Sequence, residues 1–574
     1  MNMPRLIVAA SLLRQTIYTL GLSFSLWAQS AWAIAPASHA VASPHPLATE
    51  AGLQILRQGG NAFDAAIAVS AALAVVEPYG SGVGGGGFFL VRQAQTNDDP
   101  LYQFLDARER APLAAQADLY RRNGQVQREL SLNGPLAAAI PGLPAGWVSL
   151  AEQHGSLPLS VLLAPAIHWA EQGFPVDETY QERAGWRLNA LREDPTSARI
   201  FLRNEQIPAL GTRITQPDLA KTLKSIAKYG NAGFYQGPIA QQMVTAVRAS
   251  GGIWSLQDLR DYRTEWREPL LFPLANERTL ISAPPPSAGG LIVAQALGLL
   301  EHTQWAQANP AEQRHLLIEA LRQAYRDRGL LGDPDFVTQP IAPLLDAAYL
   351  DRMAQQIDPQ RATPSAQLAP RAVPTEGTDT THFAVLDQQG NAVAATLSLN
   401  MMFGAAYTVP NTGVLLNDQM DDFAADLQGQ NAYGLAGSVA NQIAAGKRPL
   451  SSMSPTFIES PRDFITLGAP GGSRIPSMVV IASLAYFQGA DALQAAAQPR
   501  LHHQYLPDVV EYEHEALTQD EQAELQQRGH HLKEMQRNYG NQQIIIWDKD
   551  QGRVDAASDP RGQGVAATLS SPHQ

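Results

Sequence analysis

The distribution of apolar residues near the start of the chain predicts two helices followed by a strand. Apolar side chains fall at helical spacing between Ala51 and Leu56, and Gly59-Gly60-Asn61 then interrupts the pattern. The Ala- and Val-rich segment 64–76 is apolar nearly all round, which is typical of a helix buried on every side. A glycine-rich run then leads into the strand pattern of 88–92.

Farther along, the pattern predicts a change of structure near residue 380. Helical spacing recurs over 144–153, 159–172 and 312–328. From about 358 to 379 the composition turns to Pro, Ala, Thr, Gln and Ser, which favours a linker. Beyond it, strand and turn patterns dominate 380–485. We expect a large composite domain or two coupled lobes, because 574 residues exceed what one simple core usually holds.

The segment after the linker is predicted to form a β-hairpin that starts at a pair of threonines. Strand patterns lie on both sides of a turn that contains Gly390. A four- or five-residue loop places Thr380 opposite Leu397 or Ser398. In the second register the Ser398 hydroxyl lies beside Thr380, whereas a slip by one residue would turn it to the other face.

The stretch PTEGTDTTHF, residues 374–383, has two interpretations. One is a loop entering a sheet, where Thr is a favoured residue. The other is a cleavage site between Asp379 and Thr380. Hydrolysis there would give Thr380 a free α-amine, which titrates near ~7.7–8.0 and can act as base for the hydroxyl of the same residue. That hydroxyl can also make the cut, by attacking the Asp379 carbonyl to form an ester that water releases.

Composition and charge exclude several classes of protein. The formal net charge of −13, without basic runs interleaved with aromatic residues, disfavours a nucleic-acid partner. The chain has no Cys, which excludes disulfides and thiolate metal sites. The G-x-G-x-x-G match at 82–87 follows a helix and precedes a strand, the reverse of a dinucleotide site, so we expect closely packed backbone there. The pairs His502-His503 and His530-His531 are expected in core or surface roles rather than at a metal, because neighbours on a strand face opposite ways.

The first 33 residues have the features of a secretory signal peptide. Arg5 and Arg14 accompany an apolar stretch, and the small residues Ala31 and Ala33 form an A-x-A ending. We expect cleavage after Ala33 and export to a bacterial periplasm; release to the medium and an uncleaved anchor are the alternatives. No later stretch approaches the ~20 uninterrupted apolar residues that a membrane span needs.

Several motifs in order along the chain resemble the γ-glutamyltranspeptidase family. They are VASPHPLATEAGLQIL, GGGGFFL, LDARERAP, TTHFAVLDQQGNAVAATLSLN, NTGVLLNDQMDDF, KRPLSSMSPT, GAPGGSR, RLHHQYLPD and SDPR. The resemblance implies an α+β N-terminal nucleophile (Ntn) hydrolase, with two stacked antiparallel sheets between helical layers in an αββα sandwich. It also implies autoproteolysis into a large subunit, 34–379, and a small catalytic subunit, 380–574.

By the same resemblance Thr380 is the nucleophile, and its ester with a γ-glutamyl group is passed to water or to an amine. The glutamyl end is a zwitterion on one carbon. Its recognition requires guanidinium and hydroxyl donors on one side and carboxylate or amide acceptors on the other. The matching positions are Arg108, Ser451 and Ser452 for the α-carboxylate, and Asn400, Gln419 and Asp422 for the α-ammonium.

Four more positions take roles from the family. Gly471 and Gly472 would offer backbone N–H groups to the negative charge that develops on the attacked carbonyl. Thr381 would support the nucleophile through its hydroxyl. Tyr433 would close a lid over the glutamyl pocket; without the family, its loop reads as an ordinary surface loop.

The chain departs from the family pattern at two places. Ser398 stands where Thr is usual, so the hydroxyl that positions the nucleophile remains but loses the methyl group that restricts χ1. Met401-Met402 replace more polar residues, so the acceptor side is expected to be more apolar.

The expected substrates are glutathione and other γ-glutamyl compounds, with amino acids or dipeptides as acceptors. The two subunits are expected to form a heterodimer, and neither a cofactor nor a metal is expected. One alternative is an acylase of the same fold acting on glutaryl side chains of cephalosporins, whose substrates lack the α-ammonium. The other is a periplasmic family member without catalysis, which would remain one uncut chain.

Overall fold

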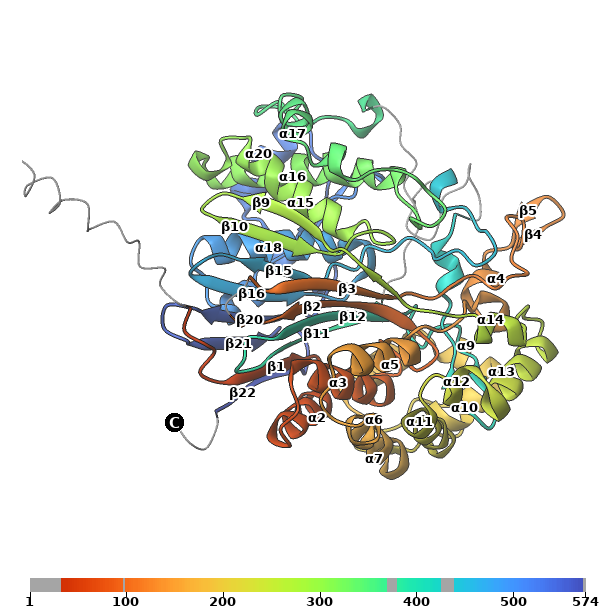
Figure 1. The fold of residues 1–574 in the computed structure, drawn as a ribbon. Helices are drawn as coiled ribbons and strands as arrows, with labels where there is room; N and C mark the ends of the chain where they lie inside the picture. The colour runs from red at the N-terminus through yellow and green to blue at the C-terminus, as the bar shows by residue number, and fades with distance from the viewer. Residues whose placement is uncertain (1–32, 97–98, 369–378, 425–437, 571–574) are drawn as a thin grey trace, which may run out of the picture.

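Two antiparallel sheets stack face to face at the centre of the molecule (Figure 1). The computed structural model describes residues 33–96, 99–368, 379–424 and 438–570. The first sheet has the order β22 (Val565–Leu569), β1 (His39–Ser43), β11 (Asp379–Leu386), β12 (Ala392–Asn400), β2 (Gly86–Gln93), β3 (Leu101–Ala107) and β8 (Glu265–Arg267). The second has the order β21 (Val554–Ser558), β20 (Gln543–Asp548), β16 (Asp463–Gly468), β15 (Thr456–Glu459), β10 (Arg278–Ser282) and β9 (Leu270–Leu274).

Helices cover the outer face of each sheet, which confirms the expected αββα sandwich (Figure 1). The first sheet is covered by α2 (Pro46–Arg57), α3 (Ala62–Val76) and α5 (Leu143–His154). The second is covered by α15 (Gly289–Glu301) and α18 (Ile475–Phe487), and α16 (Pro310–Asp327) packs on α15. No helix in the described ranges is long and apolar enough to cross a membrane.

Strand β11 shows how the sequence pattern builds these layers. Its Phe383 and Val385 belong to the hydrophobic core between the first sheet and helices α2 and α3. Ala384 and Leu386 belong to the other core, which includes the space between the two sheets. Successive side chains of a strand face opposite ways, so a strand between two apolar layers reads as a continuous apolar run.

The predicted break between the first two helices is the N-cap of α3. The Asn61 side chain accepts hydrogen bonds from Phe63 N and Asp64 N, and Asp64 bonds back to Asn61 N in a capping box. Every residue of α3 is buried, as its apolar composition predicts. The chain leaves this helix at Glu77, which lies at the site described below.

The other helices form a lobe beside the first sheet and smaller elements around the second (Figure 1). The predicted helix 159–172 is divided into α6 (Leu159–Leu162) and α7 (Ala164–Gln172). The lobe continues through α8 (Glu178–Trp186), α9 (Leu188–Glu193), α10 (Pro195–Phe201), α11 (Pro217–Tyr229), α12 (Ala232–Tyr235), α13 (Gly237–Ala249) and α14 (Leu256–Arg260). Near the second sheet lie α17 (Ala347–Ala354), α19 (Ala492–Ala496) and α20 (Gln519–Gln527).

Two expectations need correction. The strand and turn interpretation of 380–485 is wrong for α18, whose uniformly apolar sequence has no period that separates a buried helix from a buried strand. The beginning of the predicted linker is packed: Ser365 is buried, and its N–H and hydroxyl bond to Asp508 and Arg322. The rest of the linker, 369–378, and the expected signal peptide up to residue 32 lie outside the described residues.

The glycine run before β2 is closely packed, as expected. A Cβ on Gly84 would lie 2.1 Å from the Leu415 carbonyl oxygen, and one on Gly85 would lie 2.3 Å from that of Ser398. These clashes with backbone explain the glycines without any nucleotide.

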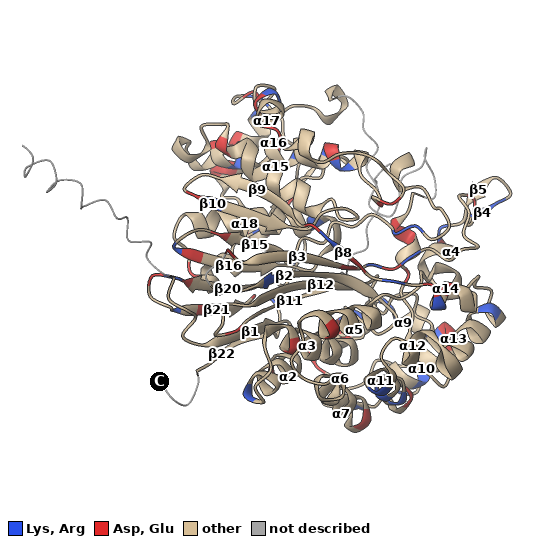
Figure 2. Ribbon diagram, in the orientation of Figure 1, with Lys and Arg blue, Asp and Glu red and all other residues tan. Residues whose placement is uncertain are grey.

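Charged residues occur mainly on loops and outer helices, and most of the sheet ribbon is uncharged (Figure 2). Arg92 on β2 is an exception that links the two sheets. Its guanidinium donates to both Glu459 oxygens at 2.8 and 2.7 Å. Burial alone would raise the pKa of Glu459, but the hydrogen bonds and charges of Arg92 and Lys549 lower it to about 2. This paired carboxylate therefore stays ionised.

Three of the four histidines in the pairs 502–503 and 530–531 are buried in the core. His502 bonds to Ser477 at 2.8 Å, His503 to Asp508 at 3.1 Å, and His530 to His315 at 2.8 Å. His315, His530 and Glu319 lie close enough to share an ion, but His315 Nε2 also contacts the Asp358 carbonyl oxygen at 2.8 Å and Glu319 accepts from Arg322 at 3.1 Å. Because His315 and Glu319 already bond to protein groups, the cluster can be explained by packing of the core.

Acid is expected to destabilise the fold because its buried histidines are neutral. Burial lowers the pKa of His382 and His502 to about 3, of His503 to about 4 and of His530 to about 2. The unfolded chain, with histidine pKa values near 6.5, binds more protons below that pH, so stability decreases as pH falls. Glu109 and Asp421 act in the opposite direction, because burial raises their pKa values to about 8 and about 6.

Because the histidines gain protons on unfolding throughout this range, we expect the free energy of unfolding to decrease as the pH falls from 7.0 to 5.5. Thermal denaturation at pH 7.0 and pH 5.5 measures it as a lower Tm at the more acidic pH. An equal or higher Tm at pH 5.5 would contradict the assignment of these histidines as neutral core residues.

Candidate active site

Thr380 lies on β11 at an irregularity of the predicted hairpin. Thr381 pairs with Leu397 and Asp379 pairs with Asn400, so two residues of β12 oppose Thr380. The second of the two expected registers is therefore confirmed, with Ser398 across from Thr380. A bulge of this kind re-aims side chains locally, and such irregularities concentrate next to active sites.

The loop that follows β16 brings a backbone donor to Thr380. The Gly471 N–H donates to Thr380 Oγ1 at 3.4 Å. Gly471 and Gly472 have φ values of 134° and 58°, in the region that favours glycine. The loop therefore lies beside the threonine, and Gly472 follows Gly471 at the start of the turn into α18.

The next two residues of β11 fix the orientation of the strand. Thr381 Oγ1 donates to Glu77 Oε2 at 2.8 Å, from the other side of the sheet. The ring of His382 packs so closely on Gly468 that a Cβ there would lie 2.2 Å from its Cε1 atom. Alternation along the strand therefore directs Thr380 and His382 toward the second sheet and Thr381 toward the helices.

Three of the residues expected to bind a zwitterion meet in one buried ion pair and its hydrogen bonds. Arg108 Nη2 donates to Asp422 Oδ2 at 2.5 Å, and Gln419 Nε2 donates to the same oxygen at 2.5 Å. Arg108 Nε also donates to the Pro449 carbonyl oxygen at 3.2 Å. Burial raises the pKa of Asp422, and the Arg108 guanidinium opposes that rise. In this uncut chain the charges of Arg108 and Asp422 therefore compensate each other.

Two amide oxygens of the set are buried without a hydrogen-bond donor in the described part of the chain. They are Asn400 Oδ1 and Gln419 Oε1. Each amide nitrogen is occupied: that of Asn400 donates to Asp418, and that of Gln419 to Asp422. Leaving a buried acceptor unsatisfied costs about 1–3 kcal/mol, so each of these oxygens would be stabilised by a hydrogen-bond donor of a ligand.

The two serines are held as hydrogen-bond acceptors. Ser451 Oγ accepts from Met453 N at 3.1 Å, and Ser452 Oγ accepts from Arg328 Nε at 3.1 Å. A serine hydroxyl has one proton to donate in addition to its acceptor lone pairs. Both O–H groups can therefore donate to a carboxylate, as the sequence predicts.

Some residues that hold this site were missed by sequence reasoning. Glu77 binds Thr381, Asp418 accepts from Asn400 Nδ2 and Met401 N, and Arg328 donates to Ser452. Burial raises the pKa of Asp418 well above its ordinary value. The only local signal was Glu77 at the end of an otherwise apolar helix; nothing in the sequence separated Asp418 from its acidic neighbours.

A cavity of about 490 Å³ opens beside the threonine, which lies in its wall. Glu77, Met401, Met402 and Gly471 surround the same inner end. None of the six residues expected to bind the glutamyl zwitterion lines this cavity. Tyr433, the expected lid residue, lies outside the described residues.

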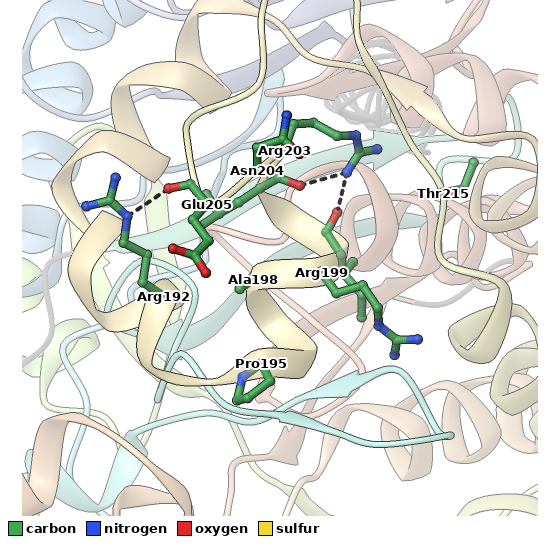
Figure 3. A pocket seen from close by; sticks show the side chains of 10 residues that line it. Arg192, Pro195, Ala198, Arg199, Arg203, Asn204, Glu205 and Thr215 are labelled. Atoms are coloured by element: carbon green, nitrogen blue, oxygen red, sulfur yellow. Dashed lines mark hydrogen bonds between the residues drawn. The ribbon is translucent and has the colours of Figure 1, made fainter.

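A second pocket, of about 630 Å³, lies around α10 and contains no candidate catalytic residues (Figure 3). Its arginines mostly support the local backbone: Arg192 donates to the Glu205 carbonyl oxygen at 2.7 Å and Arg203 to that of Leu202 at 2.9 Å. Arg199 also lines it. The pocket holds no nucleophile with an activating partner, so the site is at Thr380.

The αββα sandwich with a threonine on a central strand of one sheet defines an Ntn hydrolase. Comparisons with known proteins give the same class. The gamma-glutamyltranspeptidase family model matches residues 48–569, and the chain belongs to this family. Glutathione hydrolase proenzymes are similar at 39% identity in Pseudomonas aeruginosa, covering 96% of this chain and 98% of that protein, and at 37% in Escherichia coli, covering 91% and 90%.

Two solved structures are also similar. A cephalosporin acylase from Bacillus halodurans has a TM-score of 0.81 at 28% identity, covering 93% of this chain and 96% of that chain. A gamma-glutamyltranspeptidase from Helicobacter pylori has a TM-score of 0.55 at 36% identity, covering 59% of this chain and 95% of that one.

Proposed function

We propose that this protein is a γ-glutamyltranspeptidase and glutathione hydrolase that uses Thr380 as its nucleophile. The observation that carries the proposal is the complementarity of the buried set to an amino-acid zwitterion. Arg108 and two serine hydroxyls can donate to an α-carboxylate, while Asn400 Oδ1 and Gln419 Oε1 accept no hydrogen bond from the described residues. The glutathione hydrolase names of the relatives support the same substrate class.

Substrate binding would exchange one internal ion pair for two external ones. The α-carboxylate would take Arg108 from Asp422, and the α-ammonium would pair with Asp422 and with the two amide oxygens. Such an exchange keeps each buried charge compensated, which a ligand with only one of the two charges does not do.

Maturation would begin with attack of Thr380 Oγ1 on the carbonyl carbon of Asp379. The bond from that carbon to Thr380 N breaks, the nitrogen takes up a proton, and an ester joins the two residues through Oγ1. Water then hydrolyses the ester and leaves the Asp379 carboxylate and a free hydroxyl and amine on Thr380. The Gly471 N–H at 3.4 Å from Oγ1 supports a role for this loop in stabilising the oxyanion.

Catalysis would repeat the same steps on a γ-glutamyl amide. The free α-amine of Thr380 removes the proton from its own hydroxyl, the γ-glutamyl ester forms, and the amine of the leaving group takes the proton. Water completes hydrolysis, whereas an amino acid or dipeptide completes transfer. Ser398, across from Thr380, is proposed to position the nucleophile, and Thr381 to hold the strand through Glu77.

The glutaryl acylase is the second candidate, because a cephalosporin acylase shares the fold. A glutaryl group carries the carboxylate but no α-ammonium. It would leave Asn400 Oδ1 and Gln419 Oε1 without donors, so the site favours the γ-glutamyl group.

One experiment tests the function and separates the two candidates. The purified protein should give two bands on a denaturing gel, and the smaller band should begin Thr-Thr-His-Phe. It should hydrolyse γ-glutamyl-p-nitroanilide at least about tenfold faster than glutaryl-p-nitroanilide, because the glutaryl group would leave at least one buried acceptor unsatisfied. Faster glutaryl hydrolysis would identify the acylase. An uncut, inactive chain would identify a family member without catalysis.

The proposed subunits are 34–379 and 380–574, joined as a heterodimer after the cut. The proenzyme names of relatives support processing. Many contacts cross between these segments, including β1 paired with β11 and β12 paired with β2, so the halves would stay together. Export to the periplasm through the N-terminal signal is proposed from the sequence features of residues 1–33.

A further inference from the structure

The cavity beside Thr380 lies apart from the residues that bind the glutamyl group. Arg108, Asp422 and the other four members of that set are buried and outside its lining. An acyl enzyme holds the acyl group on one side of its nucleophile and must receive the leaving group or acceptor on another. Thr380 lines this cavity and none of the six residues of that set does, and its volume of about 490 Å³ is in the ordinary range for small-molecule sites, ~300–1,000 Å³.

The outer part of this cavity is rich in arginine. Arg183, Arg187, Arg474 and Arg537 line it. Arg474 is committed to Glu511 at 2.6 Å, Arg537 contacts Glu182 at 3.0 Å, and Arg187 donates to Asn133 at 2.8 Å. Arg183 has no acidic partner in the described part of the chain. The Arg183 guanidinium can therefore donate hydrogen bonds to an anionic ligand.

An aromatic side chain fixes Arg183 in place. Its guanidinium carbon lies 4.5 Å from the centre of the Trp186 ring, and that of Arg537 lies 4.1 Å from the same ring. Stacking on an aromatic face orders a planar guanidinium and leaves its N–H edge free for a carboxylate. Trp186 remains 42% exposed, so its ring can also contact a ligand.

A further polar group in the wall is unsatisfied. The Tyr539 hydroxyl is buried without a hydrogen-bond partner in the described residues, and the Tyr539 side chain lines the same cavity. Met401 and Met402 provide an apolar surface nearer the threonine, in agreement with the expectation of an apolar acceptor side. The lining of the cavity thus combines arginine side chains with the apolar side chains of Met401 and Met402.

We infer that Arg183, stacked on Trp186, binds the free carboxylate of the leaving group and of the acceptor, an amino acid or short peptide. This inference rests on the proposed function and names the subsite for its second substrate. Arg183 and Trp186 belong to α8 before the cut, and Arg537 belongs to the chain after it. The subsite therefore spans both proposed subunits.

The test compares two acceptors that differ only in that carboxylate. Mature enzyme is assayed with γ-glutamyl-p-nitroanilide as donor and with glycylglycine or glycylglycine amide as acceptor, and kcat/KM is measured for each. In Arg183→Gln the ratio of glycylglycine to its amide should fall about tenfold, because a charge-assisted hydrogen bond to the carboxylate is lost. Arg183→Lys should keep most of the ratio.

The matched control is Arg199→Gln, which removes an arginine from the pocket of Figure 3 and should leave the ratio unchanged. An unchanged ratio in Arg183→Gln, or equal losses for both acceptors, would overturn the subsite while the proposed function stands. Absence of donor turnover in the unaltered protein would overturn the proposed function itself, and the subsite with it.

Discussion

Replacing Thr380 by alanine is expected to leave the chain as one uncut band and to reduce γ-glutamyl turnover below detection, by at least about 10⁴-fold. The substitution removes the only oxygen that both proposed reactions use as nucleophile. Thr380 lines the cavity with the Gly471 N–H at 3.4 Å from its Oγ1, whereas the hydroxyl of its neighbour Thr381 donates to Glu77. Gel electrophoresis and hydrolysis of γ-glutamyl-p-nitroanilide measure the two effects.

Thr380→Ser is the matched control, because it keeps the hydroxyl and the α-amine after cleavage. It should mature and retain activity, at a lower rate, since serine lacks the methyl group that restricts χ1. Turnover that survives in Thr380→Ala would refute the mechanism. Cleavage without turnover would refute the proposal that one residue performs both reactions.

Replacing Arg108 by glutamine should lower kcat/KM for γ-glutamyl-p-nitroanilide by about 100-fold or more, mainly through KM. Truncating one partner of a buried, hydrogen-bonded charge pair costs about 2–5 kcal/mol. The variant loses the donor for the α-carboxylate, and Asp422 loses its 2.5 Å partner while it remains buried. Steady-state kinetics on mature protein, verified by its two bands, measure the effect.

Two variants serve as controls for Arg108. Arg108→Lys keeps the charge but not the planar fork, and should give an intermediate loss. Arg110→Gln changes a neighbouring arginine, whose Nε donates to the Gly446 carbonyl oxygen and not to Asp422, and should stay within about threefold of the unaltered protein. A value of kcat/KM in Arg108→Gln that also stays within threefold would show that this arginine does not bind the substrate.

The local features of the fold could be predicted where one physical rule dominates. The break at Gly59-Gly60-Asn61, the buried helix α3 and the hairpin around Gly390 follow from turn chemistry and periodicity, and all three are present. Helix α18 was missed because it is apolar on every face, so that its period carries no signal.

The motifs gave the candidate binding residues but not their mutual contacts. Of these residues, the structure joins Arg108, Gln419 and Asp422 by hydrogen bonds. The sequence could not indicate that Arg108 and Asp422, 314 residues apart, form an ion pair in the uncut chain. Nor could it separate the glutamyl-binding set from the cavity beside Thr380, because that separation depends on how loops from both sheets pack.

The sequence by itself determined the class of chemistry: a threonine at a strand start, a hydroxyl across the hairpin and the residue types that match a zwitterion. The first two follow from strand alternation and turn chemistry, which are local, whereas the residues expected to bind a zwitterion came from the resemblance of the motifs to the γ-glutamyltranspeptidase family. The tertiary structure alone decided that Glu77 holds Thr381, 304 residues away. It also decided that two buried amide oxygens find no donor, and Arg183 in the cavity lining no acid, among the residues that the structure describes. Such contacts depend on sheet stacking and burial, because only packing decides which polar groups lose water and find no partner.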